Sequence, residues 1–338
     1  METPEATGAT VPLEVSPKLL EPLVTVVATL GELGATPGDV PLPKPPGSLR
    51  AGLVALILKI CRAMEHRQGE ATYLRRALAT AGDNWATAGD NWATVATITH
   101  KWQESVASVE AAWATIAEDA TCLRDACGAV ATTGATTGVS KGNLAEAVAR
   151  ENSACRDVLE AARALPTASE WATVAEAVAA HKTRVAEASA GLQAATKATE
   201  ATVVTMLDAM VARDRGRLVA VAHEPLGRLV AACHGATLFY RHLRRHLEDI
   251  ETTRHGGPEA PGVAQGGPGG PKDLLAAVAV AEVLWDASAR LASVYLLGTL
   301  QKVRGLLVTP NATGATTVAQ RCREATAALP GLLSQGPR

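Results

Sequence analysis

The chain has 338 residues, and its 47% hydrophobic content is enough to bury the core of one large domain or two ordinary ones. Aromatic residues make up only 3%, and runs of alternating Val, Ile and aromatic residues are nearly absent, which excludes a β-rich fold and indicates an all-α one. The 32 basic and 34 acidic residues give a net charge of −2, which removes the electrostatic case for a nucleic-acid-binding protein.

The first 47 residues are expected to form a polar leader, a short helix and a proline-rich connector. Apolar residues recur at helical spacing over residues 18–33. Residues 36–47 (TPGDVPLPKPPG) contain too much proline for a helix and predict a stiff, extended connector. Pro43 and Pro46 form a P-x-x-P pattern that an SH3-type groove can bind, but a spacer between two helices is the simpler interpretation.

A heptad pattern begins behind a good N-cap, Ser48, and predicts one long helix from Leu53 to Cys127. Apolar residues recur there at alternating steps of three and four without a change of phase. Only Arg67 and Thr99 are polar among the seam positions, so the pattern strongly favours a continuous helix.

Within that stretch, residues 79–85 (ATAGDNW) are repeated at 86–92. A seven-residue unit preserves the heptad phase, as a long helix requires. Gly82 and Gly89 favour a break instead, since each glycine costs about 1 kcal/mol in a helix interior. We expect continuity, because the phase is the same on both sides.

Further helical patterns follow to the C-terminus. One covers residues 144–165, and another runs from residue 171 until Pro225, which should kink or break it. Residues 255–272 are rich in glycine and proline and predict a flexible linker. Helices are predicted at 273–307 and 317–329, separated by Pro310.

These elements predict an all-α fold, namely an elongated antiparallel helical bundle or coiled coil built on one very long helix, with a flexible Gly/Pro linker before the last helices. The expected divisions are the leader, short helix and connector at 1–47, a long-helix bundle at 48–254, the linker at 255–272, and C-terminal helices at 273–338 that pack back on the bundle.

Tryptophans occupy the predicted seam and favour a bundle over a two-stranded coiled coil. Trp85, Trp92 and Trp113 share one seam position, and indoles are too large for a parallel dimer core unless small residues face them. Exposed Trp can form binding hot spots, but seam filling is the interpretation we favour. His181 also falls in a seam position and is expected to be a packed core histidine.

One basic cluster is the candidate interaction surface, and it consists of Arg241, His242, Arg244, Arg245 and His246. His242 and His246 are four residues apart, a spacing that can bind zinc, with Cys233 and Glu248 nearby. The surrounding arginines oppose a second cation, so a solvated helix face is the simpler interpretation. An acidic partner or anionic lipid headgroups are the other ligands that this cluster suits.

No motif points to catalysis. The chain has no Gly-rich phosphate loop after a strand, no G-x-S-x-G and no H-E-x-x-H, and its six cysteines include no C-x-x-C pair. We therefore predict no catalytic, cofactor-binding or metal-ligating residue, no cofactor, and no disulfide.

The functional prediction is a non-catalytic cytoplasmic scaffold that binds protein partners, with self-association as one form of that binding. The alternative is a bundle that binds lipid or a membrane surface through apolar faces such as Leu53–Ile60 and Leu274–Leu300. Residues 1–5 resemble no signal peptide, and no apolar run suggests a transmembrane segment, which is why the cytoplasm is the expected location.

Overall fold

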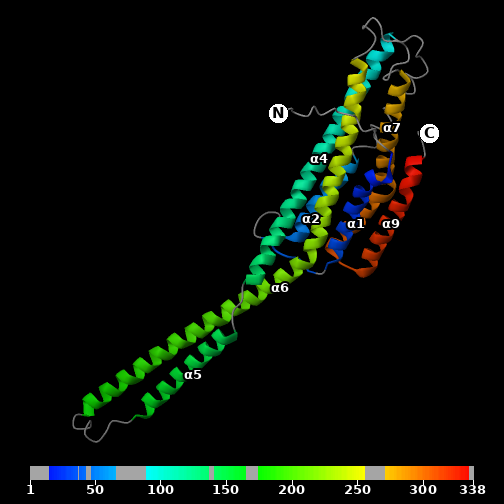
Figure 1. Cartoon of the computed structure of the whole chain (residues 1–338). Helices are drawn as coiled ribbons and strands as arrows, with labels where there is room; N and C mark the ends of the chain where they lie inside the picture. The colour runs from blue at the N-terminus through cyan, green and yellow to red at the C-terminus, as the bar shows by residue number, and fades with distance from the viewer. Residues whose placement is uncertain are drawn as a thin grey trace, which may run out of the picture. The chain divides into compact units, whose positions relative to one another are not determined.

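The computed structural model confirms the all-α prediction. It describes residues 15–36, 38–42, 47–65, 89–136, 141–164, 174–255 and 271–334. Within these ranges the regular structure is helical, apart from one isolated bridge between Pro41 and Ser48. The predicted helical bundle with one very long helix is present, and that helix is α6 (Val174–His255), of 82 residues (Figure 1).

The helices divide between two compact units. In chain order they are η1 (Pro17–Leu19), α1 (Glu21–Ala35), α2 (Leu49–Glu65), α4 (Gly89–Thr136), α5 (Lys141–Arg163), α6, α7 (Pro271–Arg290), the π-helical η4 (Leu291–Leu296), α8 (Leu297–Val308) and α9 (Ala312–Ser334). Unit 1 comprises Met1–Cys127 and Val221–Arg338, and unit 2 comprises Gly128–Ala220. Both α4 and α6 contribute residues to both units.

The predicted continuous helix from Leu53 to Cys127 is wrong, and one ion pair shows why. Lys59 of α2 pairs with Asp119 of α4, 60 residues further along the chain. One straight helix would hold these residues about 90 Å apart. α2 and α4 are therefore separate helices that lie side by side. The duplicated segment and its Gly82 fall within residues 66–88, outside the described residues, and α4 begins at Gly89.

The heptad seam itself is confirmed in α4, because its predicted positions are buried. They are Thr99, Trp102, Val106, Val109, Trp113, Ile116, Ala120, Leu123 and Cys127. The Gln103 side chain Nε2 donates a 2.9 Å hydrogen bond to the Leu247 carbonyl of α6, and the Trp102 ring meets Trp285 of α7 edge-on at 6.3 Å. Trp102 and Trp113 thus fill the core of unit 1, whereas the side chains of Trp85, Trp92 and Trp171 lie outside the described part of the chain.

The N-terminal segment packs into unit 1. Val40 and Leu42 of the predicted connector are buried, and Leu42 N donates to the Gly47 carbonyl at 3.0 Å. The Ser48 hydroxyl accepts from Ala51 N at 3.2 Å, which confirms the predicted N-cap of α2. Pro43 and Pro46, the predicted P-x-x-P pattern, lie outside the described residues.

Two prolines behave differently. Pro310 separates α8 from α9, as predicted. At Pro225 a kink or a break was predicted, and the break is wrong, because α6 continues through this residue. Leu226 and Leu229, just beyond this proline, are completely buried in unit 1, and their packing holds the helix through a residue that lacks one backbone donor. The predicted linker falls mainly on residues 256–270, outside the described ranges.

One helical stretch of the described residues, Ala277–Val308, is long and apolar enough to cross a membrane. Of the 18 consecutive residues that make this stretch most apolar, 44% are buried inside the protein. The core helix of a soluble protein has the same length and composition. Length and composition alone do not decide between these two kinds of helix. The prediction that the chain has no transmembrane segment therefore stays a prediction.

Candidate interaction surface

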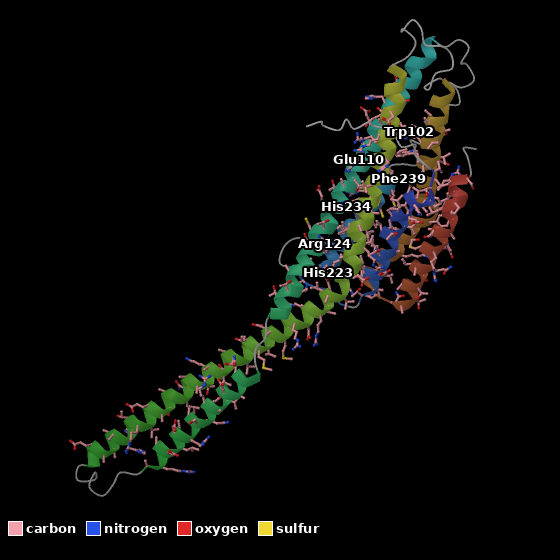
Figure 2. The ribbon with its side chains drawn as sticks, viewed as in Figure 1. Trp102, Glu110, Arg124, His223, His234 and Phe239 are labelled. Carbon is pink, nitrogen blue, oxygen red and sulfur yellow. The ribbon has the colours of Figure 1, made fainter. Side chains whose placement is uncertain are left out.

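The structure ties most of the predicted basic cluster to other helices of unit 1. Arg241 Nε lies 2.9 Å from Glu110 Oε1, and Arg244 Nε lies 2.7 Å from Glu110 Oε2. Arg244 also pairs with Glu248 on its own helix. Glu110 belongs to α4 (Figure 2), so its carboxylate joins α4 to α6. We name Glu110, Arg241 and Arg244 the Glu110 clamp.

The electrostatics of the clamp favour the charged carboxylate. Burial raises the pKa of Glu110, but hydrogen bonds from Arg241 and Arg244 outweigh that effect and hold the pKa below its ordinary value. The same carboxylate raises the pKa of Arg244 by hydrogen bonding, against the effect of burial.

The other members of the cluster have separate environments. His246 Nε2 lies 2.9 Å from the Ala277 carbonyl of α7, and His242 and Arg245 are exposed. Among the described residues, no three His, Cys, Asp or Glu side chains gather as a metal site would require. Two of the five side chains of the basic cluster, His242 and Arg245, are exposed. The role of the cluster as an interaction surface stays a prediction.

A different surface stands out in unit 2. Large apolar side chains follow one side of α6 and remain between 36% and 57% exposed. We define the α6 apolar face by these residues: Val203, Val204, Leu207, Met210, Val211 and Leu218. Such a continuous apolar stripe on a helix is typical of a surface that another helix covers.

The part of α6 just before this face packs on α5. Thr199 Oγ1 donates to the Ala147 carbonyl at 3.3 Å, and Thr196 Oγ1 donates to Glu151 Oε1 at 3.0 Å, so α5 and α6 run antiparallel (Figure 1). The buried residues among those described in unit 2 are Ala147, Ala177, Ala209, Gly216 and Val219. Apart from Val219, the buried residues described in unit 2 are therefore small, whereas the α6 apolar face stays exposed.

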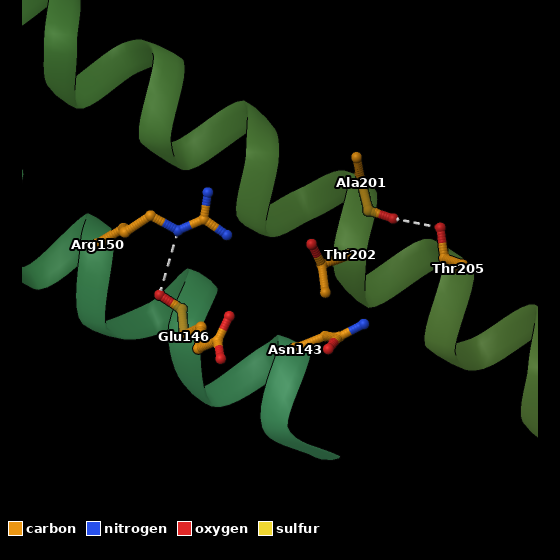
Figure 3. A pocket seen from close by; sticks show the side chains of 6 residues that line it. All are labelled: Asn143, Glu146, Arg150, Ala201, Thr202 and Thr205. Atoms are coloured by element: carbon orange, nitrogen blue, oxygen red, sulfur yellow. Dashed lines mark hydrogen bonds between the residues drawn. The ribbon is translucent and has the colours of Figure 1, made fainter. Parts of the chain in front are cut away.

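A polar groove lies beside this face, between α5 and α6. It has a volume of about 480 Å³ and is lined by Asn143, Glu146, Arg150, Ala201, Thr202 and Thr205 (Figure 3). Arg150 Nε donates to the Glu146 carbonyl at 3.4 Å, and the Thr205 hydroxyl donates to the Ala201 carbonyl at 2.8 Å. Arg150 and Thr205 therefore each bond to the backbone of their own helix.

The cysteines lie in two kinds of environment, and His181 lies apart from them. All six thiols are free, and only Cys122 and Cys155 are exposed. Burial raises the pKa of Cys127 to about 11 and that of Cys233 to about 12, which disfavours the nucleophilic thiolate. His181, expected in a packed core, is only partly buried, and its Nδ1 has no hydrogen-bond partner in the described structure.

The α6 apolar face is the surface that the sequence analysis missed. Val204, Leu207, Val211 and Leu218 recur at heptad steps, while Ala209 and Gly216 mark a second, smaller-residue side of the same helix. Two apolar sides on one helix are the signal that could have revealed it, since a surface helix needs only one.

Comparison with known proteins adds no assignment to this geometry, because no protein-family model, curated protein or solved structure matches the chain.

Proposed function

We propose that the protein is a non-catalytic cytoplasmic helical scaffold that binds protein partners through the α6 apolar face. One observation carries this proposal: a row of large apolar side chains on α6 stays exposed in unit 2, as Leu207 does with 55% of its surface. Unit 1 provides the stable body, with completely buried side chains such as Trp113, Ile116 and Tyr240.

The energetics favour a covered face. Burying apolar surface contributes about 25 cal/mol per Å², so a row of half-exposed Val, Leu and Met side chains leaves favourable free energy unused in the isolated chain. A protein partner that covers the row gains this free energy, and the aliphatic residues at its centre are where binding energy is expected to concentrate.

A membrane surface is the second candidate. Arg213, Arg215 and Arg217 flank the α6 apolar face, and cations beside an apolar stripe suit anionic lipid headgroups. The apolar stretches first considered for lipid binding, Leu53–Ile60 and Leu274–Leu300, contain buried core residues of unit 1, so they would contact lipid only if unit 1 opened.

The test compares two triple variants of the full chain in cells by affinity capture and proximity labelling. Val204→Ser, Leu207→Ser and Val211→Ser together disrupt the face. Val148→Ser, Leu159→Ser and Val178→Ser provide the matched control, because these residues are also exposed and apolar but lie elsewhere in unit 2. We expect a set of captured proteins, copies of the chain included, to be lost only with the first variant.

Identical captured sets for the two variants would exclude the face as a protein-binding surface. Flotation with phosphatidylcholine vesicles, with and without phosphatidylserine, separates the membrane candidate. Binding that requires phosphatidylserine and is lost in the face variant would replace a protein partner with a membrane.

A further inference from the structure

We infer that the partner of the α6 apolar face is an amphipathic helix of another protein, with a Lys or Arg in its apolar seam opposite Asp214 and carboxylates at its edges opposite Arg215 and Arg217. This inference rests on the proposed function, because it names the chemistry of the partner proposed there. The seam, the charge within it and the charges beside it each support such a partner.

The α6 apolar face has the geometry of a coiled-coil seam. Val204, Leu207, Val211, Asp214 and Leu218 recur at alternating steps of three and four. The four apolar side chains are 36–57% exposed, and the Asp214 side chain is 72% exposed. The alternating steps keep these side chains on one line along about 20 Å of helix, which is a surface that another helix can cover.

Asp214 interrupts this seam with a negative charge. An apolar partner that covered the seam would remove water from the carboxylate, which is unfavourable unless a cation takes the place of that water. Arg217 Nη1 lies 3.8 Å from Asp214 Oδ1, and both side chains are at least 70% exposed, so this pair is a weak one. A partner with a Lys or Arg opposite Asp214 pairs the carboxylate and fixes the register of the two helices.

Arginines lie on both edges of the seam beside Asp214. Arg215 follows Asp214 on one edge, Arg217 precedes Leu218 on the other, and both arginines are exposed. Paired helices form salt bridges through these edge positions, so two cations there favour carboxylates on both edges of the partner. Asp208 lies on the edge of Arg215 one heptad earlier and has the opposite charge. The acidic part of the partner is therefore limited to the half of the seam around Asp214.

The same charges disfavour two other occupants. A second copy brings an identical seam, whose only charged residue is Asp214, and so it offers the carboxylate no cation. An anionic membrane attracts Arg215 and Arg217, but Asp214 lies within the stripe that would enter the lipid, where a carboxylate is costly.

Synthetic helical peptides of three heptads test the inference by fluorescence anisotropy with the full-length chain. The first peptide has a Leu and Val seam with one Lys at its middle, Glu at the edge positions beside this Lys, and Gln at the other edges, so that it can pair in either direction. The second peptide has the charges exchanged, with Asp in the seam and Lys at those edges. We expect the first peptide to bind at least about tenfold more tightly. Equal affinities, or no binding of the first peptide, would overturn the inference.

A charge exchange at Asp214 tests the register. Asp214→Lys should weaken binding of the first peptide about tenfold, because two cations then meet in the seam. A third peptide, which differs from the first only by Asp at the middle of the seam, should bind this variant about tenfold more tightly than it binds the wild type. Asp157→Lys is the matched control, since Asp157 is an exposed aspartate of α5 in the same unit, and it should leave the affinities unchanged. Equal losses in the two variants, or no recovery with the third peptide, would contradict the proposed pairing.

The failure of this inference is distinguishable from that of the proposed function. Peptides that bind without regard to charge, and are lost with Val204→Ser, Leu207→Ser and Val211→Ser together, would refute the charged partner and keep the face as a protein-binding surface. A wild-type chain that dimerises through the face in sedimentation equilibrium would refute the inference and keep the proposed function, with a second copy as the partner. Flotation that requires phosphatidylserine and is lost in the face variant, with no peptide bound, would refute both.

Discussion

Glu110 shows how a single carboxylate can decide which helices pair. It accepts hydrogen bonds from two arginines one helical turn apart on α6, and its side chain is only 13% exposed. Hydrogen bonds between charged groups contribute more than neutral ones, and a partly buried pair is screened less than a surface pair. The basic residues that the sequence offered as a binding surface therefore act, in part, within the molecule.

We expect Glu110→Gln to lower the free energy of unfolding by about 1–2 kcal/mol near neutral pH, because Arg241 and Arg244 lose their charged acceptor. Urea unfolding provides the measurement. Glu104→Gln on the same helix is the control, since the Glu104 side chain is 67% exposed and its ion pair with His100 should contribute little. Equal effects of the two substitutions would show that the clamp is no stronger than a surface pair.

The lowered pKa of Glu110 predicts a pH dependence. A carboxyl group whose pKa is lower in the folded than in the unfolded state stabilises the fold above its ordinary pKa, about 4.3, and this contribution disappears as the pH falls through the folded-state value. The stability difference between wild type and Glu110→Gln should therefore shrink as acid is added below about pH 4.5. A difference that stays constant down to about pH 2.5 would contradict this assignment.

Close helix approach at Gly235 predicts opposite effects for two glycine substitutions in α6. A Cβ at Gly235 would lie 2.8 Å from Pro22 Cγ of the rigid proline ring, whereas one at Gly227 meets nothing within 4 Å. Gly235→Ala should destabilise by about 1–3 kcal/mol. Gly227→Ala should stabilise by up to about 1 kcal/mol, because alanine favours the helix. Thermal unfolding of the pair measures both signs, and destabilisation of similar size at both sites would refute the close approach.

At the scale of the helix, the sequence predicted which residues are buried in α4 but not which helix covers them. The period alone identifies Val106, Trp113 and Ile116 as one side of a helix, and that side is buried. The same phase continues into α2, so periodicity could not show that the two segments are separate helices. Only a long-range contact, Lys59 with Asp119, carries that information.

Pro225 and the α6 apolar face illustrate the same limit. Local chemistry disfavours a helix at Pro225, yet the buried leucines on its C-terminal side hold it in place. At Val204 and Leu207 the pattern is apolar as in a core, yet both side chains stay more than half exposed. In both cases tertiary packing decides, and a single sequence does not contain it.

The unequal cores of the two units predict unequal hydrogen exchange along the single helix α6. Residues 226–247 include the completely buried Leu229, Tyr240 and Leu243, whereas Ala177 and Ala209 are the buried residues of 175–211. Amides of 178–200 should therefore exchange at least about tenfold faster than those of 226–247 under conditions where the chain is monomeric. Exchange mass spectrometry measures this, and uniform protection along α6 would show that unit 2 has more stability than its packing indicates.

For the whole molecule, thiol accessibility reports the integrity of unit 1. Cys61, Cys127, Cys233 and Cys322 are buried there, and burial raises the pKa of each. We expect a thiol reagent to modify Cys122 and Cys155 rapidly near pH 8, and the other four only as the protein unfolds. Peptide mapping identifies the sites. Rapid modification of Cys233 in the native chain, where its pKa is about 12, would contradict the packing of α6.

The π-helical turn η4 makes the length of the last core helix adjustable. Buried residues follow alternating steps at Val278, Ala281, Trp285, Ser288 and Ala292, then resume one position late at Leu296, Leu300, Val303 and Leu307, while Val294 is 68% exposed. The turn thus absorbs one surplus residue. Deleting Val294 should leave a regular helix that presents both sets to the core, whereas deleting the exposed Gly305 from α8 should rotate Leu306 and Leu307 out of place. Thermal unfolding of the two deletions would show whether this segment is a site where evolution could add or remove a residue without rebuilding the core.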